Sequence, residues 1–417
     1  MTLKSLGIPL LIAMLIGLAV LMLIYPVAYL EAALRGLAIW WDVLFPSLFP
    51  FFIISEVLLG FGIVHLIGTL LDPFMKPVFR IPGSGGFVAA MGYVSGYPIG
   101  AKLTAQLWQQ KMVNRHEGER LVAFTTSSDP IFLIGAVSIG FFHNPQIVPI
   151  LAIAHYGGGF LVGIIMRYHG SKDSEETQHE SQAPTKPRIN RLKVALRAMH
   201  QARVQDGRNL GELLQDAILS SLKLIIVVGG LVVFFSVFLE LLTQADIMKG
   251  LYLIIEQILT VIGIPPALSH SLVGGIFEVT LGARYAGESA ISIPLSFKVA
   301  AAAFILSWGG LSVHAQIASI LHSTNLRYWP FMIARLIHGI LAATLVLLLW
   351  NTVAGDLDSQ NTLLSMDNIT QSNVHSPYGF INNLFIFIIL LFAIALLSVM
   401  SSIIKSFWMR FRHILDK

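Results

Sequence analysis

Residues 121–166 decide the fold class: they read LVAFTTSSDPIFLIGAVSIGFFHNPQIVPILAIAHYGGGFLVGIIM. Asp129 is the only Asp, Glu, Lys or Arg among them. A helix of about 20 apolar residues crosses a bilayer, so this stretch has room for two crossings. A carboxylate at membrane depth is costly unless it is paired or functional. The stretch therefore predicts a membrane bundle that holds one functional or structural carboxylate.

The composition of the whole chain agrees with this prediction. Of its 417 residues, 55% are hydrophobic and 12% are charged, and a typical soluble domain has about twice that charged share. A cytosolic enzyme, a disordered chain and a nucleic-acid-binding protein are ruled out as leading interpretations, because the polar surface is too small. Cysteine is absent, so disulfides, thiolate nucleophiles and cysteine-ligated metals are excluded. We expect an all-α, polytopic membrane helix bundle.

Long windows without Asp, Glu, Lys or Arg recur along the chain, among them 5–30, 81–101 and 368–404. The first window predicts a retained helix, because it is too long for a signal peptide and no clear cleavage site follows it. The third and eighth predicted segments are short and rich in glycine, so each either spans the membrane or re-enters it. The windows predict eleven membrane segments, at 6–29, 43–70, 85–101, 121–142, 147–167, 219–242, 248–263, 265–284, 299–321, 329–350 and 383–404.

The positions of lysine and arginine predict the orientation. Seven basic residues and one acid lie in Lys186–Arg208, four basic residues lie in Lys102–Arg120, and four more follow Ile404. The loop Asn351–Asn382 has three aspartates and neither lysine nor arginine. We therefore expect a cytoplasmic C-terminus, an N-terminus outside, and this acidic loop outside.

A polar stretch at 170–212 divides the chain. Its first part is acidic and predicts a flexible linker. Its second part, RINRLKVALRAMHQAR at 188–203, predicts a helix lying on the anionic inner leaflet, with an ordinary solvated helix as the alternative. The predicted units are a helix with its connector, a first membrane repeat, the linker, a second membrane repeat, an outer loop, and a last helix with a basic tail, at 1–42, 43–169, 170–212, 213–350, 351–382 and 383–417.

The two membrane halves share a pattern. Tyr93–Lys102 resembles Glu278–Arg284 once three residues are dropped, and the pair at 123–124, Ala-Phe, recurs at 303–304. Interrupted segments at matching positions of two oppositely oriented halves are typical of transporters with a site near the bilayer midplane. Lipid cannot satisfy the backbone groups that such breaks expose, so protein, water or a ligand must do so. We predict two inverted-topology repeats with broken or re-entrant helices.

Four polar segments interrupt the apolar ones and supply candidate binding residues. They are SGYPIGAK at Ser95–Lys102, TTSSDP at Thr125–Pro130, EVTLGAR at Glu278–Arg284, and SWGGLSVHAQ at Ser307–Gln316. The predicted substrate-binding residues are Ser95, Gly96, Tyr97, Pro98, Lys102, Ser127, Ser128, Asp129, Glu278, Thr280, Arg284, Ser312, His314 and Gln316.

Each segment also has a plainer interpretation. Asp129 is either a cation or proton site or the cap of a half-helix, and His314 is either a ligand or a packed polar residue. Glu278 is either functional or ion-paired with Arg284 or Arg335. The first segment is either a substrate-lining break or a kink with Lys102 at the inner face. Other isolated polar groups are interpreted as inter-helix pairs or helix ends: Glu56, His155, Glu240, Glu256 and Arg335.

The run PSLFPFFIISE at Pro46–Glu56, the SGYPIGAK and SSDP segments and the paired second half resemble the YlbJ group of sporulation integral membrane proteins. That group belongs to the wider nucleoside-recognition, or gate, domain superfamily, and the resemblance covers about residues 40–350. It implies two gate-like repeats, an endospore-forming bacterium, a role in making the spore cortex, and a membrane that surrounds the forespore. It does not carry over a ligand, because gate domains also occur in proteins without a proven nucleoside substrate.

Two functions fit these residues. The first is a transporter or channel for a small polar or anionic solute, coupled to H⁺ or Na⁺ through Asp129 or Glu278. The second is a non-transporting scaffold that contacts cortex-assembly proteins through 186–208 and 351–382. No enzyme, catalytic residue, metal or cofactor is predicted, since no motif of these kinds appears. Membrane lipids, other sporulation membrane proteins or a second copy are the expected partners, and nucleic acid is not.

The predicted orientation can be tested by cysteine labelling, because the natural chain has no cysteine. An impermeant maleimide added to intact cells should label Ser359→Cys and leave Ser181→Cys unlabelled until the cells are opened. The opposite labelling pattern would overturn the predicted orientation.

Overall fold

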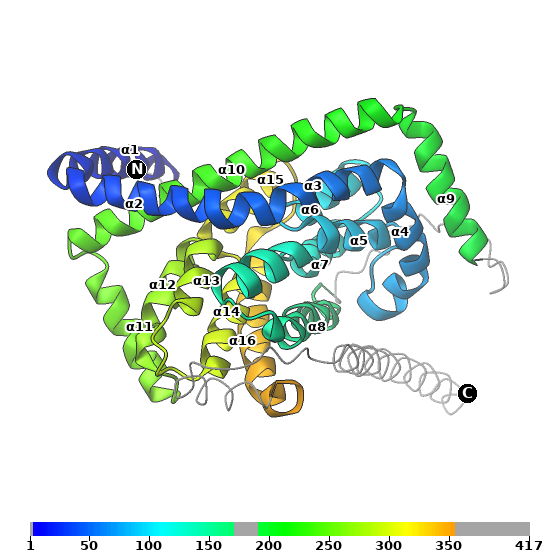
Figure 1. Ribbon diagram of the computed structural model, residues 1–417. Coiled ribbons are helices and arrows are strands. Elements are labelled where there is room, and N and C mark those ends of the chain that lie inside the picture. Colours follow the sequence, from blue (N-terminus) through cyan, green and yellow to red (C-terminus); the bar gives the residue numbers. More distant parts are fainter. Residues whose placement is uncertain (1–2, 171–190, 355–417) are drawn as a thin grey trace, which may run out of the picture.

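The computed structural model describes residues 3–170 and 191–354, and every regular element in these ranges is a helix (Figure 1). The helices before the linker are α1 Leu3–Ile24, α2 Pro26–Ala38, η1 Ile39–Leu44, α3 Phe45–Gly60, α4 Ile63–Phe74, η2 Met75–Phe79, α5 Gly85–Ser95, α6 Ile99–Gln109, α7 Arg115–Thr125, η3 Phe132–Phe141, η4 Pro145–Ile147 and α8 Val148–Met166. Those after it are α9 Arg191–Asp206, α10 Leu210–Gln244, α11 Lys249–Val261, η6 Pro266–Leu268, α12 Ser269–Phe277, α13 Val279–Gly287, α14 Leu295–Trp308, α15 Gly310–His322 and α16 Tyr328–Val353.

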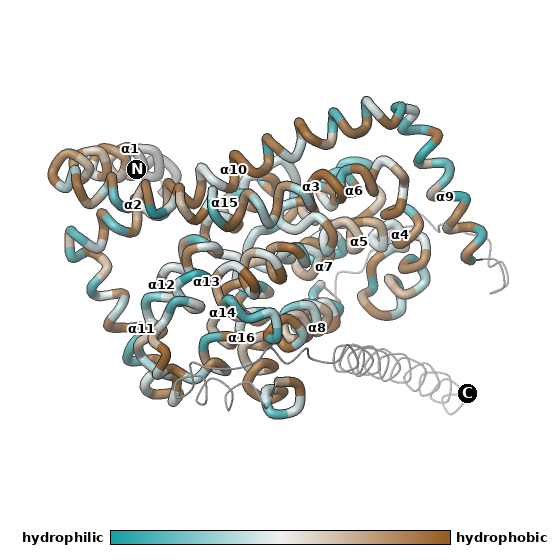
Figure 2. Tube along the Cα trace, in the orientation of Figure 1, coloured by the Kyte–Doolittle hydropathy of each residue, from teal (hydrophilic) through white to brown (hydrophobic). Residues whose placement is uncertain are grey.

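Several helical segments of the described residues are long and apolar enough to cross a membrane. Apolar residues dominate the long helices, whereas polar residues gather on α9 and at its corner with α10 (Figure 2). The predicted all-α membrane protein is therefore confirmed. The five segments are Pro26–Gly60, Pro145–Met166, Leu210–Gln244, Leu295–His322 and Tyr328–Val353.

The predicted single segment at 43–70 is wrong. The chain turns at Gly62, whose φ of 76° lies in the left-handed region, so α3 and α4 are separate helices. An apolar run does not reveal such a turn, because hydropathy is the same on both sides of the glycine. Four other predicted segments, at 85–101, 121–142, 265–284 and 299–321, each divide into shorter helices. The segment at 383–404 lies outside the described residues.

Helix α10 begins inside the predicted linker, because a capping box fixes its start. The side chain of Asn209 accepts from the Glu212 amide at 2.9 Å, and Glu212 accepts from the Asn209 amide at 3.0 Å. These two bonds satisfy backbone donors that the first turn of a helix leaves free. The predicted helix within the linker is α9, which packs along α4. The residues at 171–190 lie outside the described part of the chain.

Two long helical rods pack against each other. Pro26–Gly60 and Leu210–Gln244 are 35 residues each, and Figure 1 shows α10 running beside α2 and α3. Their contacts run in opposite directions along the two rods. Arg35 Nη2 donates to Glu240 at 2.7 Å, Trp40 Nε1 donates to the Ile225 carbonyl at 2.8 Å, and Gly60 lies against Leu213. The rods are therefore antiparallel.

The order of elements after α9 repeats the order before it. Each half consists of a long rod, a short helix (α4 or α11), two helices that are broken in the middle, and a final helix (α8 or α16). The two final helices also cross antiparallel. The His338 ring donates to the His155 carbonyl at 2.7 Å near the crossing, and Arg327 and His169 meet at one end. Apolar side chains of both halves share one core.

That end is held by a buried carboxylate, Glu119 on α7. Its Oε1 accepts from Arg327 Nε at 2.8 Å, and its Oε2 accepts from His169 Nε2 at 2.6 Å, while the side chain is 0% exposed. Burial alone would raise the pKa of Glu119, but the hydrogen bonds from Arg327 and His169 outweigh it and hold the pKa well below its usual range. The cluster connects α7 to the end of α8 and to the start of α16.

We expect Glu119→Ala to lower the free energy of unfolding by roughly 1.5–3 kcal/mol near pH 7, because it removes charge-assisted hydrogen bonds that a fully buried carboxylate accepts. A carboxylate whose pKa is lowered by folding stabilises the fold at pH values above its ordinary pKa of about 4.3. This stabilisation is lost as the pH falls below that value. The difference between the natural chain and the variant should therefore shrink between about pH 5 and pH 3. Glu31→Ala, at an exposed pair with Arg35, is the control and should change stability by less than about 1 kcal/mol. Denaturation of the purified protein in detergent measures both, and equal losses for the two variants would contradict the prediction.

Candidate functional site

Four helix breaks form the centre of the molecule. The first lies between α5 and α6 at Gly96–Pro98, and the second lies between α7 and η3 at Thr126–Pro130. The third separates α12 from α13 at Glu278, and the fourth separates α14 from α15 at Gly309. Gly96 and Gly309 have φ angles of 70° and 92°, which favour glycine because a side chain strains this conformation. The helices thus break within the four polar segments that the sequence singled out.

The breaks contact one another in pairs. A Cβ atom built onto Gly96 would lie 3.0 Å from Asp129 Oδ2, so the first break packs directly on the second. A Cβ atom built onto Gly310 would lie 3.2 Å from Glu278 Cα, so the fourth packs on the third. The Tyr97 hydroxyl donates to the Leu306 carbonyl and connects the two pairs. Each pair therefore joins a glycine of one break to an acidic residue of the other: Gly96 to Asp129, and Gly310 to Glu278.

The two carboxylates cap half-helices. Asp129 Oδ1 accepts from the Ile131 amide at 3.0 Å and from the Phe132 amide at 2.8 Å. Glu278 Oε2 accepts from the Leu281 amide at 2.9 Å. An anionic side chain at a helix N-terminus satisfies free amides and complements the helix dipole. The capping interpretation of Asp129 is therefore present in the geometry, and a second carboxylate oxygen remains beside Gly96.

One alternative for Glu278 was an ion pair with Arg284 or Arg335, and the described residues show neither pair. Within the described residues, Arg284 pairs with Glu288 instead, with Nε 2.7 Å from Oε1. Arg284 lies in the last turns of α13, whereas Glu278 caps the start of that helix. The first turn of α13 holds the Glu278 carboxylate, so it is turned away from Arg284.

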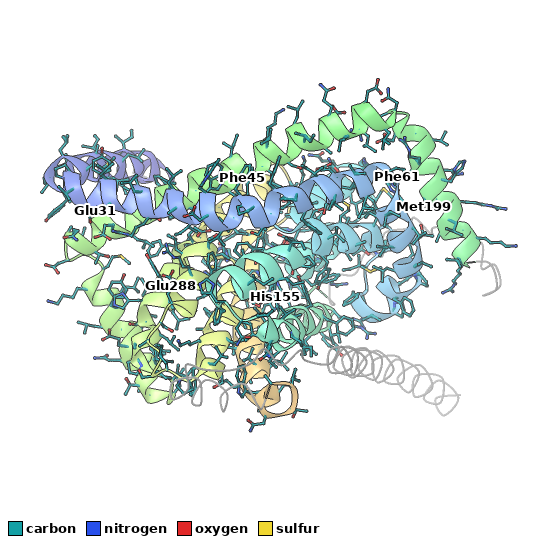
Figure 3. All side chains as sticks on the ribbon, in the orientation of Figure 1. Glu31, Phe45, Phe61, His155, Met199 and Glu288 are labelled. Carbon is teal, nitrogen blue, oxygen red and sulfur yellow. The ribbon has the colours of Figure 1, made fainter. Side chains whose placement is uncertain are left out.

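His155 on α8 lies at the centre of the bundle, where its side chain is fully buried (Figure 3). Its Nε2 lies 2.9 Å from the Ser127 hydroxyl and accepts from the Ser128 amide at 3.2 Å. Its Nδ1 lies 2.8 Å from the Ser307 hydroxyl. Because Nε2 accepts, the neutral ring carries its proton on Nδ1 and donates to Ser307. One imidazole thus connects the second break to the fourth.

Arg335 on α16 also connects the second break to the fourth, and its charged side chain is 0% exposed. Its guanidinium donates to the Thr126 carbonyl at 2.5 Å and to the Leu306 carbonyl at 3.3 Å. It also bonds His338 Nδ1 at 3.0 Å and lies 5.9 Å from the Tyr97 ring centre. The carbonyls are at the C-terminal ends of α7 and α14, where the helix dipole favours a cation. Among the described residues, no carboxylate lies within salt-bridge distance of this guanidinium.

These partners occupy equivalent positions in the two halves. His155 and Arg335 are 180 positions apart, as are Ser127 and Ser307, and also residues 126 and 306. Arg335 therefore bonds the equivalent carbonyls of both halves, and His155 contacts the equivalent serine hydroxyls. The sequence showed the offset of 180, but His155 and Arg335 were interpreted only as inter-helix pairs or helix ends. Ser307 and His338 were missed as site residues. Applying the offset to His155 would have pointed to Arg335.

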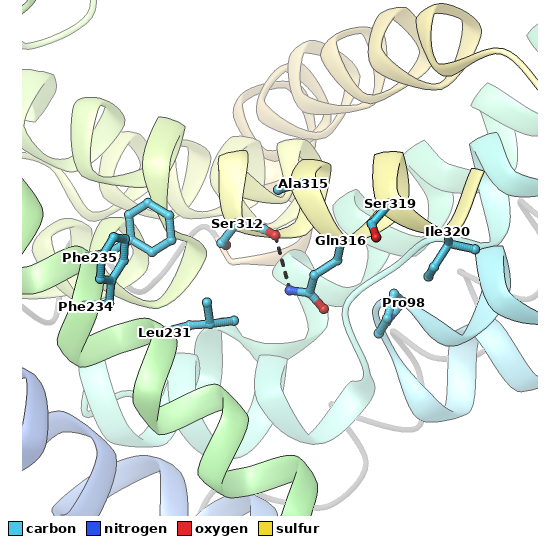
Figure 4. Close-up of a pocket in the computed structure, with 9 residues that line it drawn as sticks. All are labelled: Pro98, Leu231, Phe234, Phe235, Ser312, Ala315, Gln316, Ser319 and Ile320. Atoms are coloured by element: carbon cyan, nitrogen blue, oxygen red, sulfur yellow. Dashed lines mark hydrogen bonds between the residues drawn. The ribbon is translucent and has the colours of Figure 1, made fainter. Parts of the chain in front are cut away.

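A groove of about 560 Å³ opens beside this centre (Figure 4). Three predicted residues line it: Pro98, Ser312 and Gln316. The others are Leu231, Phe234, Phe235, Ala315, Ser319 and Ile320. The groove therefore lies between the start of α6, one face of α15 and the middle of α10.

Other predicted residues are not brought to the groove. Lys102 is exposed on α6, as its plainer interpretation expected. His314 is 2% exposed, and its ring nitrogens lie 2.7 Å from the Tyr328 hydroxyl and 3.1 Å from the Trp308 carbonyl. It is a packed polar side chain with both nitrogens satisfied. Thr280 donates to Glu278 at 3.2 Å, and the Ser95 hydroxyl is buried without a partner in the described structure.

Comparison with known proteins identifies the family. A family model described as nucleoside recognition (Gate) matches residues 41–158. The sporulation integral membrane protein YlbJ of Bacillus subtilis (strain 168) is 46% identical over 326 residues, which is 78% of this chain and 78% of that protein. This chain belongs to the YlbJ family of sporulation integral membrane proteins. No solved structure matches it. In this YlbJ-family protein the first two breaks and His155 lie inside the Gate match, whereas Arg335 lies outside it.

We expect Arg335→Met in this YlbJ-family protein to lower the free energy of unfolding by roughly 3–5 kcal/mol, because converging buried carbonyls lose their donor. Arg284→Met makes the same chemical change at the partly exposed pair with Glu288 and should cost less than about 1 kcal/mol. Denaturation of both purified variants in detergent checks the difference. Similar stability of the two variants would show that Arg335 does not hold the breaks together.

Proposed function

We propose that the protein is a transporter or channel for a small polar or anionic solute, and that spore cortex formation requires it. The observation that carries this proposal is the meeting of four helix breaks around two buried polar side chains. Breaks at membrane depth leave backbone dipoles that can bind a solute, and they cluster where transporters place their sites. The groove beside Pro98 and Ser312 gives a solute access to this region.

The proposal includes two inverted-topology repeats. Support comes from two pairs of helices that take equivalent places in the halves and pack antiparallel: the two long rods, and α8 with α16. Further support comes from the offset of 180, which separates His155 from Arg335, Ser127 from Ser307 and Thr126 from Leu306. Transporters built in this way alternate between two states by exchanging the conformations of their repeats.

Coupling to H⁺ or Na⁺ through Asp129 or Glu278 is part of the same proposal. Asp129 and Glu278 are buried, with exposed fractions of 9% and 6%, and the Asp129 carboxylate lies beside Gly96 of another break. A small cation near either carboxylate would offset a buried negative charge. Removing one carboxylate at a time tests which of the two binds the coupling ion.

The alternative function is a non-transporting scaffold for cortex-assembly proteins. The tight packing around His155 and Arg335, both fully buried, favours it, because a rigid centre suits a structural protein. The proposed contacts are the basic helix α9 and the loop at 351–382, which lies outside the described residues. In either case we expect a forespore-surrounding membrane, a cytoplasmic C-terminus, and partners such as other sporulation membrane proteins or a second copy.

The single experiment that best tests transport is solute profiling of sporulating cells with and without the gene. A transporter should change the level of at least one solute in the mother cell or the forespore before cortex synthesis begins. Unchanged solutes together with a failed cortex would favour the scaffold instead.

We expect Asp129→Asn to reduce the yield of heat-resistant spores by at least about tenfold while the protein accumulates normally. Asparagine caps a helix nearly as well as aspartate, so the variant removes the charge and keeps the cap. Asp246→Asn is the matched control, because it changes an exposed aspartate in a turn with a φ of 59°, a conformation that asparagine adopts readily. Spore counts and immunoblots measure the outcome. Normal spore counts from Asp129→Asn cells would limit Asp129 to capping.

A further inference from the structure

We propose that the end of the bundle where α7 and α16 begin and α8 ends binds the head group of an anionic phospholipid, through Arg80 and the arginines beside it. This surface is separate from the helix breaks, so the inference goes beyond the proposed function and does not rest on it. The binding can be measured without any measurement of transport.

Arginines from four segments of the chain come together at this surface, which we call the basic end. Arg120 Nη1 donates to the Arg80 carbonyl at 2.8 Å, and its Nε and Nη2 donate to the His169 carbonyl at 2.9 and 2.6 Å. Glu119 connects His169 to Arg327, at 2.6 and 2.8 Å. The segments after η2, at the start of α7, at the end of α8 and before α16 are thus held together. The arginines of the basic end are Arg80, Arg115, Arg120, Arg167 and Arg327.

The positive charge at the basic end exceeds the negative charge. Two glutamates of α7, Glu117 and Glu119, lie among the five arginines. Glu119 Oε1 is shared by Arg327 Nε at 2.8 Å and Arg115 Nε at 3.4 Å. Glu117 accepts from the Asn114 amide at 2.8 Å and completes the cap of α7. The basic end therefore keeps a surplus of positive charge that its own carboxylates do not neutralise.

A buried arginine of the basic end holds an exposed one in place. Arg120 is 6% exposed, and among the described residues its guanidinium donates only to main-chain carbonyls. One of these belongs to Arg80, whose φ of 55° is uncommon for a residue with a side chain. The Arg80 side chain is exposed and lies 5.9 Å from the Tyr168 ring centre. No carboxylate of the described ranges lies within salt-bridge distance of it, so the Arg80 guanidinium is open to an external anion.

The depth of the basic end indicates a lipid rather than a soluble anion. One candidate membrane-spanning segment ends directly before Arg167, and another begins directly after Arg327. Tyr168 and Trp329 beside them are 58% and 65% exposed. Tyrosine and tryptophan concentrate at the level of the lipid head groups. The arginines of the basic end therefore lie at the level of the phospholipid phosphates.

The predicted orientation places the basic end at the cytoplasmic leaflet. Its two α7 arginines belong to the segment Lys102–Arg120, whose basic residues predict a position inside. Helix α16 begins at the basic end and leads to Val353, beyond which the acidic loop is predicted outside. The cytoplasmic leaflet carries anionic phospholipids, and basic pockets between membrane helices on that side bind their head groups. Charge complementarity therefore selects an anionic phospholipid, because a guanidinium pairs well with a phosphate.

The test uses the purified full-length chain in a neutral detergent, with dihexanoyl phosphatidylglycerol as the probe. Isothermal titration should detect saturable binding of this lipid, and at least about tenfold weaker binding of dihexanoyl phosphatidylcholine, which has no net charge. Glycerol phosphate carries the charge without acyl chains and should also bind at least about tenfold more weakly, because chains against apolar helices add affinity. Equal binding of the two lipids would overturn the proposal. Equal binding of glycerol phosphate would identify a soluble anion and overturn it as well.

A pair of matched variants separates the basic end from general surface charge. Arg80→Gln should weaken phosphatidylglycerol binding roughly fivefold, which is the effect of one basic residue at an anionic surface. Arg197→Gln removes an exposed arginine of α9 and should leave the affinity unchanged. Met199 of that helix lies against Gly62 at the start of α4, whereas Arg80 follows η2 beyond the other end of α4. Equal losses for the two variants would show a general charge effect and contradict a site at the basic end.

Arg80→Glu gives a second measurement at the same position. Arg120 bonds the main chain of residue 80 whatever its side chain, so both variants keep the contact that holds this segment. Arg80→Glu removes a positive charge and adds a negative one, and it should weaken phosphatidylglycerol binding by about twenty-fivefold. A loss no larger than that of Arg80→Gln would show that charge does not drive the binding, and it would refute the proposal.

Discussion

The structure depends on one buried charge, the guanidinium of Arg335. It lies between the C-terminal carbonyls of α7 and α14, which both stop at a break inside the bundle. Lipid offers no donor to such carbonyls, so without a cation or an amide beside them the breaks would be unfavourable. Broken helices of transporters often place a bound Na⁺ at such ends. Here the chain supplies its own cation, tethered to α16.

The same constraint explains why α8 and α16 cross where they do. His155 and Arg335 take the same position in their halves, and each side chain must reach the second break and the fourth break at once. The helices can satisfy this only by crossing at the level of the breaks, which is also where His338 bonds the His155 carbonyl. Small residues at the crossing allow the approach, since a Cβ atom on Gly158 would lie 3.0 Å from the His338 ring.

The N-terminal ends of the half-helices follow a different rule, and this difference matters for function. Two of them, at η3 and α13, receive a carboxylate from the chain, and the starts of α6 and α15 have no side-chain cap. A protein that served only to hold a shape would gain stability from a cap at each end. Two uncapped helix starts agree with the transport proposal, in which a solute binds at helix breaks.

The sequence by itself determined the class of the fold and the location of the breaks. Uncharged windows are a property of composition, and glycine, proline and Asp129 mark interruptions locally, so both features were predictable before any packing was known. Even the offset of 180 was visible. What only the tertiary structure decided was the partner of each polar side chain. Arg335 bonds carbonyls rather than Glu278, Arg284 pairs with Glu288, and His314 is a packed side chain. These partners depend on which unsatisfied backbone groups of distant segments come together in space. A linear sequence does not record how close those segments lie.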